Sequence, residues 1–220
     1  MQSTPHARPH PWVRCCWALA LWPVVGAANA ATISGEQLAN VAPDSGDVSF
    51  SAADLPGVQL RVTELGAATM SGSDLFGYTG LWLGAAGNGG RYSLQFSTPV
   101  QQLALSFVAL TTLGGDEYEQ VSDLVTDQAV AISLQSPDNS AAWDGSLLVP
   151  LDEDSRGTLQ LVALQPQGFS RLSFSHLQAA PLQGWVISQI QFDLQPVPEP
   201  TPMALLACGL WMLWHHARRA

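Results

Sequence analysis

The chain has no lysine and only three cysteines, and the positions of those cysteines limit what its middle part can do. Cys15 and Cys16 lie in the first apolar stretch, and Cys208 lies in the last one. Residues 31–195 therefore have no disulfide, so the burial of apolar side chains must hold them together. The same absences exclude cysteine and lysine nucleophiles, and metal sites built on thiolates, from this part.

Positive charge is also scarce. Four of the eight basic residues lie near the ends, and the other four are Arg61, Arg91, Arg156 and Arg171. All 18 acidic residues fall between Glu36 and Glu199, so four arginines against 18 acids leave a net charge near −14. Such a surface repels phosphate backbones, which argues against a nucleic-acid partner. It predicts repulsion from anionic lipid and acidic polysaccharide as well, unless a divalent cation bridges them.

Residues 196–220 contain three parts in a fixed order. The tripeptide Pro198-Glu199-Pro200 comes first, an apolar run at 203–214 follows, and a tail at 215–220 contains Arg218 and Arg219. Proline neither continues a helix nor donates to a sheet, so we expect the tripeptide to stay extended and exposed. The order resembles the PEP-CTERM sorting signal of bacterial surface and secreted proteins. That resemblance implies an exosortase-type membrane protease as partner, with the arginines as a basic stop on the cytoplasmic side.

The apolar run is short for a permanent anchor. As a helix, residues 203–214 would span roughly 18 Å, well below the ~30 Å of a hydrocarbon core. We therefore expect a transmembrane helix that holds the protein only until it is cut, and that is the protein's only contact with the membrane. The alternative is a core helix ending a soluble domain, but such a helix should have a polar face and this run has none.

Residues 1–30 have the three parts of a secretory signal peptide. Arg8 and Arg14 form a basic region without acids, residues 15–28 are almost wholly apolar, and Ala28 and Ala30 supply small side chains for signal peptidase. We expect cleavage after Ala30 and export through the inner membrane, to the cell surface or beyond it. The alternative is a first transmembrane helix, which the short apolar run and its small-residue exit disfavour.

Residues 31–195 show the period-two alternation of β-strands, and no helical pattern of convincing length. The run at 100–110 is apolar on both faces, which predicts a central strand covered on both sides. Asn88-Gly89 predicts a type I′ hairpin between the strands that flank it. The chain predicts eight to ten strands, and hence an all-β domain, an antiparallel β-sandwich of jelly-roll-like type. The positions expected to face the core are Val58, Leu60, Val62, Tyr92, Leu94, Phe96, Leu103, Leu105, Phe107, Val130, Ile132, Leu134, Leu159, Leu161, Leu172, Phe174, Val186, Ile190, Phe192 and Leu194.

Three segments of this domain are similar to segments of PEP-CTERM proteins. They are Gly80-Leu-Trp-Leu-Gly84, Leu94-Gln-Phe-Ser97 with Pro99 after it, and Trp185–Phe192 shortly before the sorting signal. The resemblance implies a β-sandwich exported by a bacterium that has two membranes and makes exopolysaccharide. It implies no reaction.

The residues that carry chemistry form no clear catalytic pattern. His176 is the only histidine of the domain, and we interpret it as a polar residue at the end of the strand Leu172–Ser175. A Ser-His-Asp triad through His176 stays open, because triads are defined in space, and so does a carboxylate pair for glycoside hydrolysis. The acids Asp116, Glu117 and Glu119 belong to an acidic loop without a metal-ligand pattern.

Asp152, Asp154 and Gly157 begin like a calcium-binding loop, with ligands at positions 1 and 3 and glycine at position 6. The template then fails, because Arg156 takes position 5 and Ala163 takes position 12. A Ca2+ ion at Asp152 and Asp154 is one reading of this segment, and a simple solvated loop is the better match to it.

Trp143 is the residue best placed to contact a glycan, because it lies in a polar stretch where a core tryptophan is not expected. Trp82 and Trp185 lie in strands and are expected in the core. Together these features predict a non-catalytic exported protein of the cell surface or biofilm matrix, acting by adhesion or by binding extracellular polysaccharide. The alternatives are a secreted hydrolase of polysaccharide or ester, and a purely structural matrix component.

Overall fold

A computed structural model describes residues 30–43, 45–55, 57–66, 68–75, 77–85, 89–112, 119–178 and 184–194. The predictions made for the signal peptide before Ala30, including Ala28, lie outside these residues. So do those for Pro198, Glu199, Pro200, the run at 203–214, Arg218 and Arg219. Within the described ranges, no helix has the length and apolar character needed to cross a membrane.

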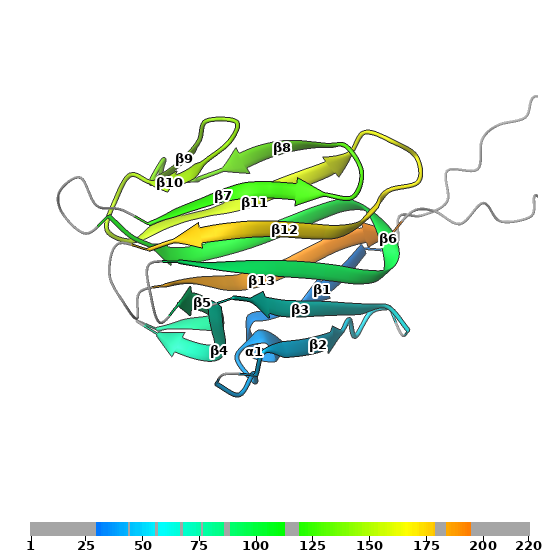
Figure 1. Cartoon of the computed structure of the whole chain (residues 1–220), viewed down its shortest axis with the longest axis horizontal. Coiled ribbons are helices and arrows are strands. Elements are labelled where there is room, and N and C mark those ends of the chain that lie inside the picture. The colour runs from blue at the N-terminus through cyan, green and yellow to red at the C-terminus, as the bar shows by residue number, and fades with distance from the viewer. Residues whose placement is uncertain are drawn as a thin grey trace, which may run out of the picture.

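The described chain is almost entirely antiparallel β-structure, as predicted (Figure 1). Its one helix is a single turn, which begins at a capping box in which Ser34 and Gln37 bond to each other's backbone N–H groups. In chain order the elements are β1 (Ala30–Ile33), α1 (Gly35–Leu38), β2 (Asp47–Ser51), β3 (Gln59–Leu65), β4 (Ala68–Leu75), β5 (Tyr78–Ala85), β6 (Gly89–Leu110), β7 (Gln120–Thr126), β8 (Val130–Gln135), β9 (Ala141–Trp143), β10 (Leu148–Pro150), β11 (Ser155–Ala163), β12 (Phe169–Leu177) and β13 (Gly184–Leu194).

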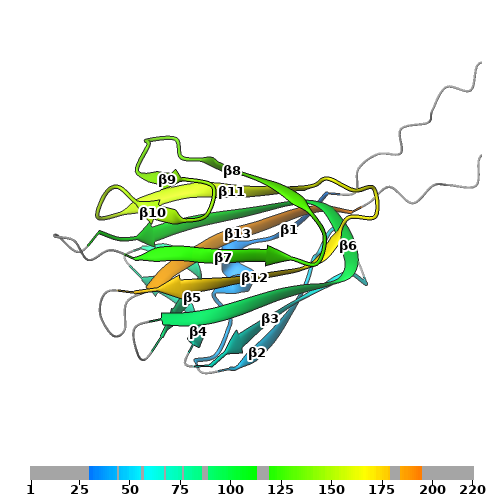
Figure 2. The ribbon, with the colours of Figure 1, turned by 45° about the horizontal axis from the view of Figure 1, so that its top comes forward.

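The long strand β6 belongs to both halves of one curled sheet. Its first half pairs with β3 and β12, and its second half pairs with β11 and β13. Phe174 pairs beside Tyr92 of β6, and Val186 pairs beside Val108, which on a straight strand would lie about 50 Å away. The ring of Phe174 nevertheless lies 5.9 Å from the ring of Trp185, the residue before Val186. The sheet therefore turns back on itself between the two halves of β6, as Figures 1 and 2 show.

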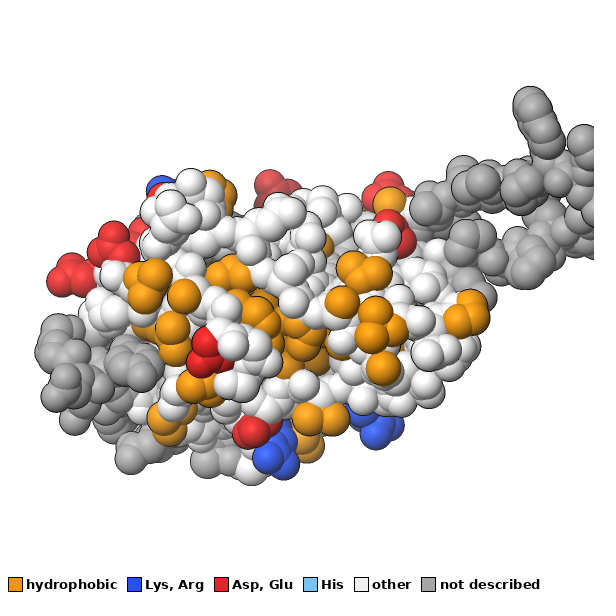
Figure 3. Space-filling model, turned by 90° about the horizontal axis from the view of Figure 1, so that it is seen from above, with side chains coloured by type: hydrophobic (Ala, Val, Ile, Leu, Met, Phe, Trp, Pro, Cys, Tyr) orange, Lys and Arg blue, Asp and Glu red, His pale blue; other side chains and the backbone are white. Residues whose placement is uncertain are grey.

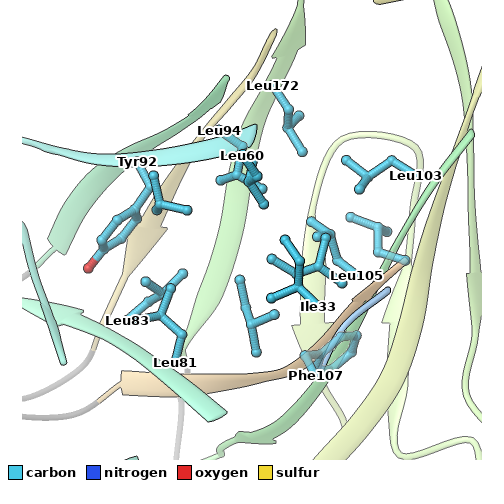
Figure 4. Packing of buried hydrophobic residues seen from close by; sticks show 14 of the residues in the cluster. Ile33, Leu60, Leu81, Leu83, Tyr92, Leu94, Leu103, Leu105, Phe107 and Leu172 are labelled. Carbon is cyan, nitrogen blue, oxygen red and sulfur yellow. The ribbon is translucent and has the colours of Figure 1, made fainter. Parts of the chain in front are cut away.

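The curl encloses one hydrophobic core. Leu94, Leu103, Leu105 and Phe107 point into it from the two halves of β6, and each is at most 1 % exposed (Figure 4). The hydroxyl of Tyr92 crosses this core and donates to the backbone oxygen of Thr69, at 2.9 Å, and to that of Gly84. These two residues belong to β4 and β5, so Tyr92 ties the first half of β6 to the hairpin opposite it.

The alternation predicted the inward face well, and it failed where the backbone departs from a regular strand. Ala104, Ser106 and Val108 are only partly buried, so the outer face of this strand is less well covered than predicted. Leu110 is buried because Ala109 has a positive φ of 60°, which breaks the alternation.

A second irregularity lies in β13. Its register shifts between Ile187 and Gln189, so Trp185 and Ile187 point inward before the shift, and Ile190 and Phe192 point inward after it.

The predicted hairpin at Asn88-Gly89 was also wrong. The strands on either side of it, β5 and β6, do not pair with each other: β5 pairs with β4 and β13, whereas β6 begins between β3 and β12. The start of β6 faces β5 across the core instead of lying beside it, as the hydrogen bond from Tyr92 to Gly84 shows.

The first and last described residues are neighbours. In β1, Ala30 pairs with Asp193 near the end of β13, and Ile33 pairs with Ile190. Residues before Ala30 and after Leu194 therefore join the domain at adjacent points. The beginning of β13, at Trp185, lies at the opposite end of the sheet.

Candidate functional site

Trp143 lies at a surface hollow formed by the end of β8, the segment after it and β9. The hollow has a volume of about 620 Å3. Trp143 is half-buried, because its inner part packs against the core, and it belongs to a three-residue strand instead of the polar loop that we expected. The hollow is lined by Leu134, Gln135, Ser136, Pro137, Asn139, Ala141, Ala142 and Trp143. No lining side chain carries a charge, so the site combines one aromatic face with neutral hydrogen-bonding groups.

Asp138 holds the segment between β8 and β9 in place. Its carboxylate accepts from the hydroxyl of Ser140 at 2.7 Å and from Nε of Arg156 at 2.7 Å. Ser140 in turn accepts from the backbone N–H of Arg156 at 3.0 Å. The hydrogen bond from Ser140, and then that from Arg156, hold the pKa of Asp138 well below its usual range. The rim of the hollow is therefore fixed to the start of β11.

Asp144 fixes the other side, the turn between β9 and β10. Its carboxylate accepts from the backbone N–H of Leu147 at 2.7 Å and from that of Ser146 at 2.8 Å, which is an Asx turn. These N–H donors lower the pKa of Asp144. The turn brings Trp143 opposite Leu148 in the β9–β10 pair, so the indole is held by a short and well-bonded hairpin.

The side of the molecule that carries β8, β9 and β10 is less polar than the composition of the chain suggests. Hydrophobic side chains gather along the middle of this face (Figure 3). The partly buried side chains that pack against the core and come from β7, β8 and β9 are Leu124, Val130, Ile132, Leu134 and Trp143.

The structure does not bring Asp152 and Asp154 into one ligand cluster. Asp154 accepts from the hydroxyl of Tyr78, and this hydrogen bond raises the pKa of Tyr78. Asp152 accepts from the backbone N–H of Glu153, at 2.7 Å, so its carboxylate stabilises the local turn. In the described part of the chain no group of three or more His, Cys, Asp or Glu side chains is close enough to hold a metal ion. Calcium binding here stays a prediction.

Sequence reasoning missed a buried cluster of Glu119, His176 and Trp185. Glu119 was assigned to an acidic loop and His176 to the end of a strand, and Glu119 does precede β7 while His176 lies one residue before the end of β12. What the assignments did not predict is burial, because the two side chains are 0 % exposed. Oε1 of Glu119 lies 3.7 Å from Nε2 of His176. The histidine and tryptophan rings lie 6.3 Å apart. The signal that was available is the alternation itself, since His176 has the same parity as the inward residues Leu172 and Phe174.

This cluster is poorly satisfied in hydrogen bonding. Oε2 of Glu119 accepts from the backbone N–H of Thr111 at 3.0 Å. Within the described residues, no partner is found for Oε1 of Glu119, for either ring nitrogen of His176 or for Nε1 of Trp185. No hydroxyl of the described residues bonds to His176, and a triad through His176 stays a prediction.

The other tryptophans divide. Trp185 is buried as predicted, at 1 % exposure, whereas Trp82 is half-exposed and was wrongly expected in the core. The chain matches no protein-family model, no curated protein and no solved structure.

Proposed function

We propose that this protein is an exported, non-catalytic component of the cell surface or extracellular matrix that binds glycan at the Trp143 hollow. The observation that carries the proposal is the composition of that hollow. An aromatic face stacks on the apolar face of a sugar ring, while amide and hydroxyl groups bond its hydroxyls. Gln135 and Asn139 supply such groups beside Trp143, whereas the hydroxyl of Ser136 already donates to the backbone oxygen of Arg156. The bonds of Asp138 and Asp144 preorganise both sides of the hollow, so little ordering is needed on binding.

We also propose that the curled sheet is a jelly-roll-like β-sandwich. In support, aromatic side chains from the two halves of the sheet meet in the core, with the rings of Phe96 and Phe192 5.2 Å apart. A sandwich of this kind displays ligand sites on its outer faces and loops while the interior is filled by side chains.

The proposed route to the surface uses both ends of the chain: a signal peptide cut after Ala30, and a PEP-CTERM signal cut near Pro198–Pro200 by an exosortase-type protease. The pairing of Ala31, the first residue after the proposed cut, with Phe192 is compatible with this route, because both segments would leave the domain at one end. A domain anchored there would direct its opposite end away from the membrane. Intact mass of the protein from the cell envelope and from the medium tests the route. Loss of residues 1–30 and of everything beyond the tripeptide is expected, and a retained C-terminal segment would refute the sorting signal.

Binding to neutral glycans tests the site. The Trp143→Ala variant should lose at least about tenfold in affinity for a neutral glycan found by array screening, equivalent to about 1.4 kcal/mol of lost stacking. Trp82→Ala is the matched control, because it removes a half-exposed indole from another strand, β5. Equal binding by wild type and Trp143→Ala would refute the site. Absence of any glycan binding by the folded protein would favour a purely structural role instead.

A further inference from the structure

Three of the four arginines of the domain lie on one face of the sheet. Arg61 of β3 pairs with Gln95 of β6, and Gln95 pairs on its other side with Arg171 of β12. Arg91 lies four residues from Gln95 on the same strand, so its side chain points to the same side. All three side chains are exposed. On β6, the alternate residues Tyr92 and Leu94 point the other way, into the core. Figure 1 shows β3, the first half of β6 and β12 side by side.

The spacing of these arginines follows from strand geometry. Arg61 and Arg171 flank one strand, so their Cα atoms are about 10 Å apart, and Arg91 lies roughly 13 Å further along β6. The positions between them on this face carry uncharged hydrogen-bonding groups. These are Thr63, Ser93, Gln95, Ser173 and Ser175.

Two of these three positive charges are unpaired. Arg61 forms a salt bridge with Asp47 of the neighbouring strand β2. In the described part of the chain, neither Arg91 nor Arg171 has a salt bridge. The carboxylate of Asp127, the acid next to Arg171, is occupied by the backbone N–H groups of Ser170 and Arg171.

Acidic side chains are almost absent from this face. The one acid within β3, Glu64, pairs beside the inward residue Tyr92, and its Oε1 accepts from the backbone N–H of Met70. The described parts of β6 and β12 contain no acid at all. Asp47, Asp123 and Asp127 lie at the margins, on β2, on β7 and directly after β7.

Two hollows mark the ends of this face. One, of about 520 Å3, is lined by Asp47, Ser49, Gln59, Arg61, Gln95, Phe96 and Ser97. The other, of about 440 Å3, includes Arg91 with Gln120, Ser122 and Ser175. Leu65 and Leu177 flank the second hollow and are 41 % and 43 % exposed. The face therefore offers two arginine-bearing depressions joined by a row of hydroxyl and amide groups.

We infer that this arginine face binds a carboxylate-bearing polysaccharide, a chain of uronic acid residues. Arginine binds carboxylates with two parallel hydrogen bonds, and the hydroxyls and amides between the arginines suit sugar hydroxyls. The inference rests on the proposed glycan-binding function and names an acidic class of ligand for it, at a face separate from the Trp143 hollow. The repulsion of acidic polysaccharide that the composition predicts is weak at this face, because charges more than about 8–10 Å away are largely screened at physiological salt.

A carboxylated glycan fits this face better than a nucleic acid does. Double-stranded DNA presents a phosphate charge about every 1.7 Å, and its binding requires a dense array of cations. Here two arginines without a salt bridge and one paired arginine are spread over more than 10 Å, and the described residues of this face include no exposed aromatic ring for stacking on bases. A polymer with one carboxylate on each sugar or on alternate sugars matches so sparse an array.

The test uses the full-length chain and sodium polygalacturonate as the probe, with dextran as the neutral polymer, in the presence of EDTA. Wild type should bind polygalacturonate, and binding should weaken as salt rises from about 50 to 200 mM. The Arg91→Gln/Arg171→Gln variant should bind at least about tenfold more weakly. Gln160→Ala is the matched control, since Gln160 lies on β11 and belongs to neither site, and it should keep wild-type affinity.

The other possible outcomes either overturn this inference or separate it from the proposed function. Equal binding by wild type and the double variant overturns the inference, as does binding that appears only when calcium replaces EDTA. Binding of duplex DNA as tight as that of polygalacturonate would assign the face to nucleic acid and overturn it as well. If Trp143→Ala abolishes neutral-glycan binding while polygalacturonate never binds, the inference fails and the proposed function stands. If polygalacturonate binds through Arg91 and Arg171 and Trp143→Ala changes nothing, the Trp143 site fails and the arginine face stands.

Discussion

The hydroxyl of Tyr92 is the polar contact that spans the curl, and its removal should have a measurable and pH-dependent cost. Tyr92 is fully buried, and its hydroxyl donates to the backbone oxygens of Thr69 and Gly84. Tyr92→Phe removes one hydroxyl and leaves two buried carbonyls with one partner fewer. From the typical worth of such a bond we expect a loss of about 1–2 kcal/mol in the free energy of unfolding at pH 8. For a domain of this size that loss lowers Tm by roughly 2–8 °C.

The same substitution should become favourable at high pH. Burial raises the pKa of Tyr92, and the negative charge of Glu64 adds to the rise. A tyrosine in the unfolded chain loses its proton near pH 10, whereas folded Tyr92 keeps it. The stability that Tyr92 contributes is therefore fully present below pH 10 and is lost as pH rises above it, by about 1.4 kcal/mol per pH unit. Tyr92→Phe has no such proton, so the two unfolding free energies should cross between about pH 10.6 and 11.5.

Urea unfolding followed by tryptophan fluorescence, at half-unit steps from pH 8 to pH 11.5, measures this crossing. Tyr78, whose pKa is also raised, is present in both proteins and cancels from the difference. Tyr78→Phe serves as the control, because its hydroxyl bonds an exposed carboxylate and its removal should change stability little. A difference between wild type and Tyr92→Phe that stays constant across this pH range would refute the reasoning, as would equal stability at pH 8.

Three further predictions concern packing, the buried cluster and the Trp143 turn. Gly72→Ala should prevent folding, because the added Cβ would lie 1.8 Å from the backbone oxygen of Ala39; recovery of soluble folded protein, judged by circular dichroism, measures this. Replacing Glu119 and His176 together by leucine should leave Tm equal or higher. Three buried polar atoms without partners disappear, each costing about 1–3 kcal/mol, and this outweighs the loss of the one hydrogen bond from Thr111 to Glu119. Asp144→Ala should speed hydrogen exchange at the backbone amides of Ser146 and Leu147, which donate to its carboxylate. In the wild type, the protection of these amides should fade as pH falls below about 4, because the lowered pKa of Asp144 shows that they bond to its ionised form.

A matched variant provides the control for each of these three predictions. Gly46→Ala places a Cβ in open space at a positive φ of 65°, so it should still fold, and a folded Gly72→Ala protein would contradict the close contact. Each single leucine variant of Glu119 or His176 should be less stable than the double variant; a double variant less stable than both singles would show that the pair is favourable. Asp193→Ala should leave exchange in the β9–β10 turn unchanged, and equal exchange in Asp144→Ala would remove the role given to that carboxylate.

The local pattern of the sequence predicted which side chains face inward. Tyr92, Leu94 and Phe96 are buried as the alternation indicates, and the strands expected around Leu60, Leu161 and Phe174 are all present. This worked because successive side chains of a strand point to opposite faces, whatever the strand pairs with. It failed at Leu110, where a positive φ at the preceding residue, which the pattern does not encode, reverses the parity.

Strand pairing could not be read in the same way. Every strand offers the same backbone N–H and C=O groups along its edges, so the sequence at Asn88-Gly89 favoured a hairpin that the tertiary structure does not form. The choice of partner depends on how the whole core fills. The hydrogen bond from Tyr92 to Gly84 accordingly joins β6 and β5 across the core.

The amino-acid sequence alone determined that the domain is acidic and lacks disulfides. It also determined that apolar and polar residues alternate along the strands and that the two ends resemble targeting segments. Only the tertiary structure decided which distant residues meet. It placed Glu119 against His176 inside the core, fixed Trp143 in a hairpin at a hollow, and collected Arg61, Arg91 and Arg171 on one face. The reason is that net charge sums over the whole surface and alternation describes one strand, whereas a site is made by side chains that pairing and curling bring together from several strands.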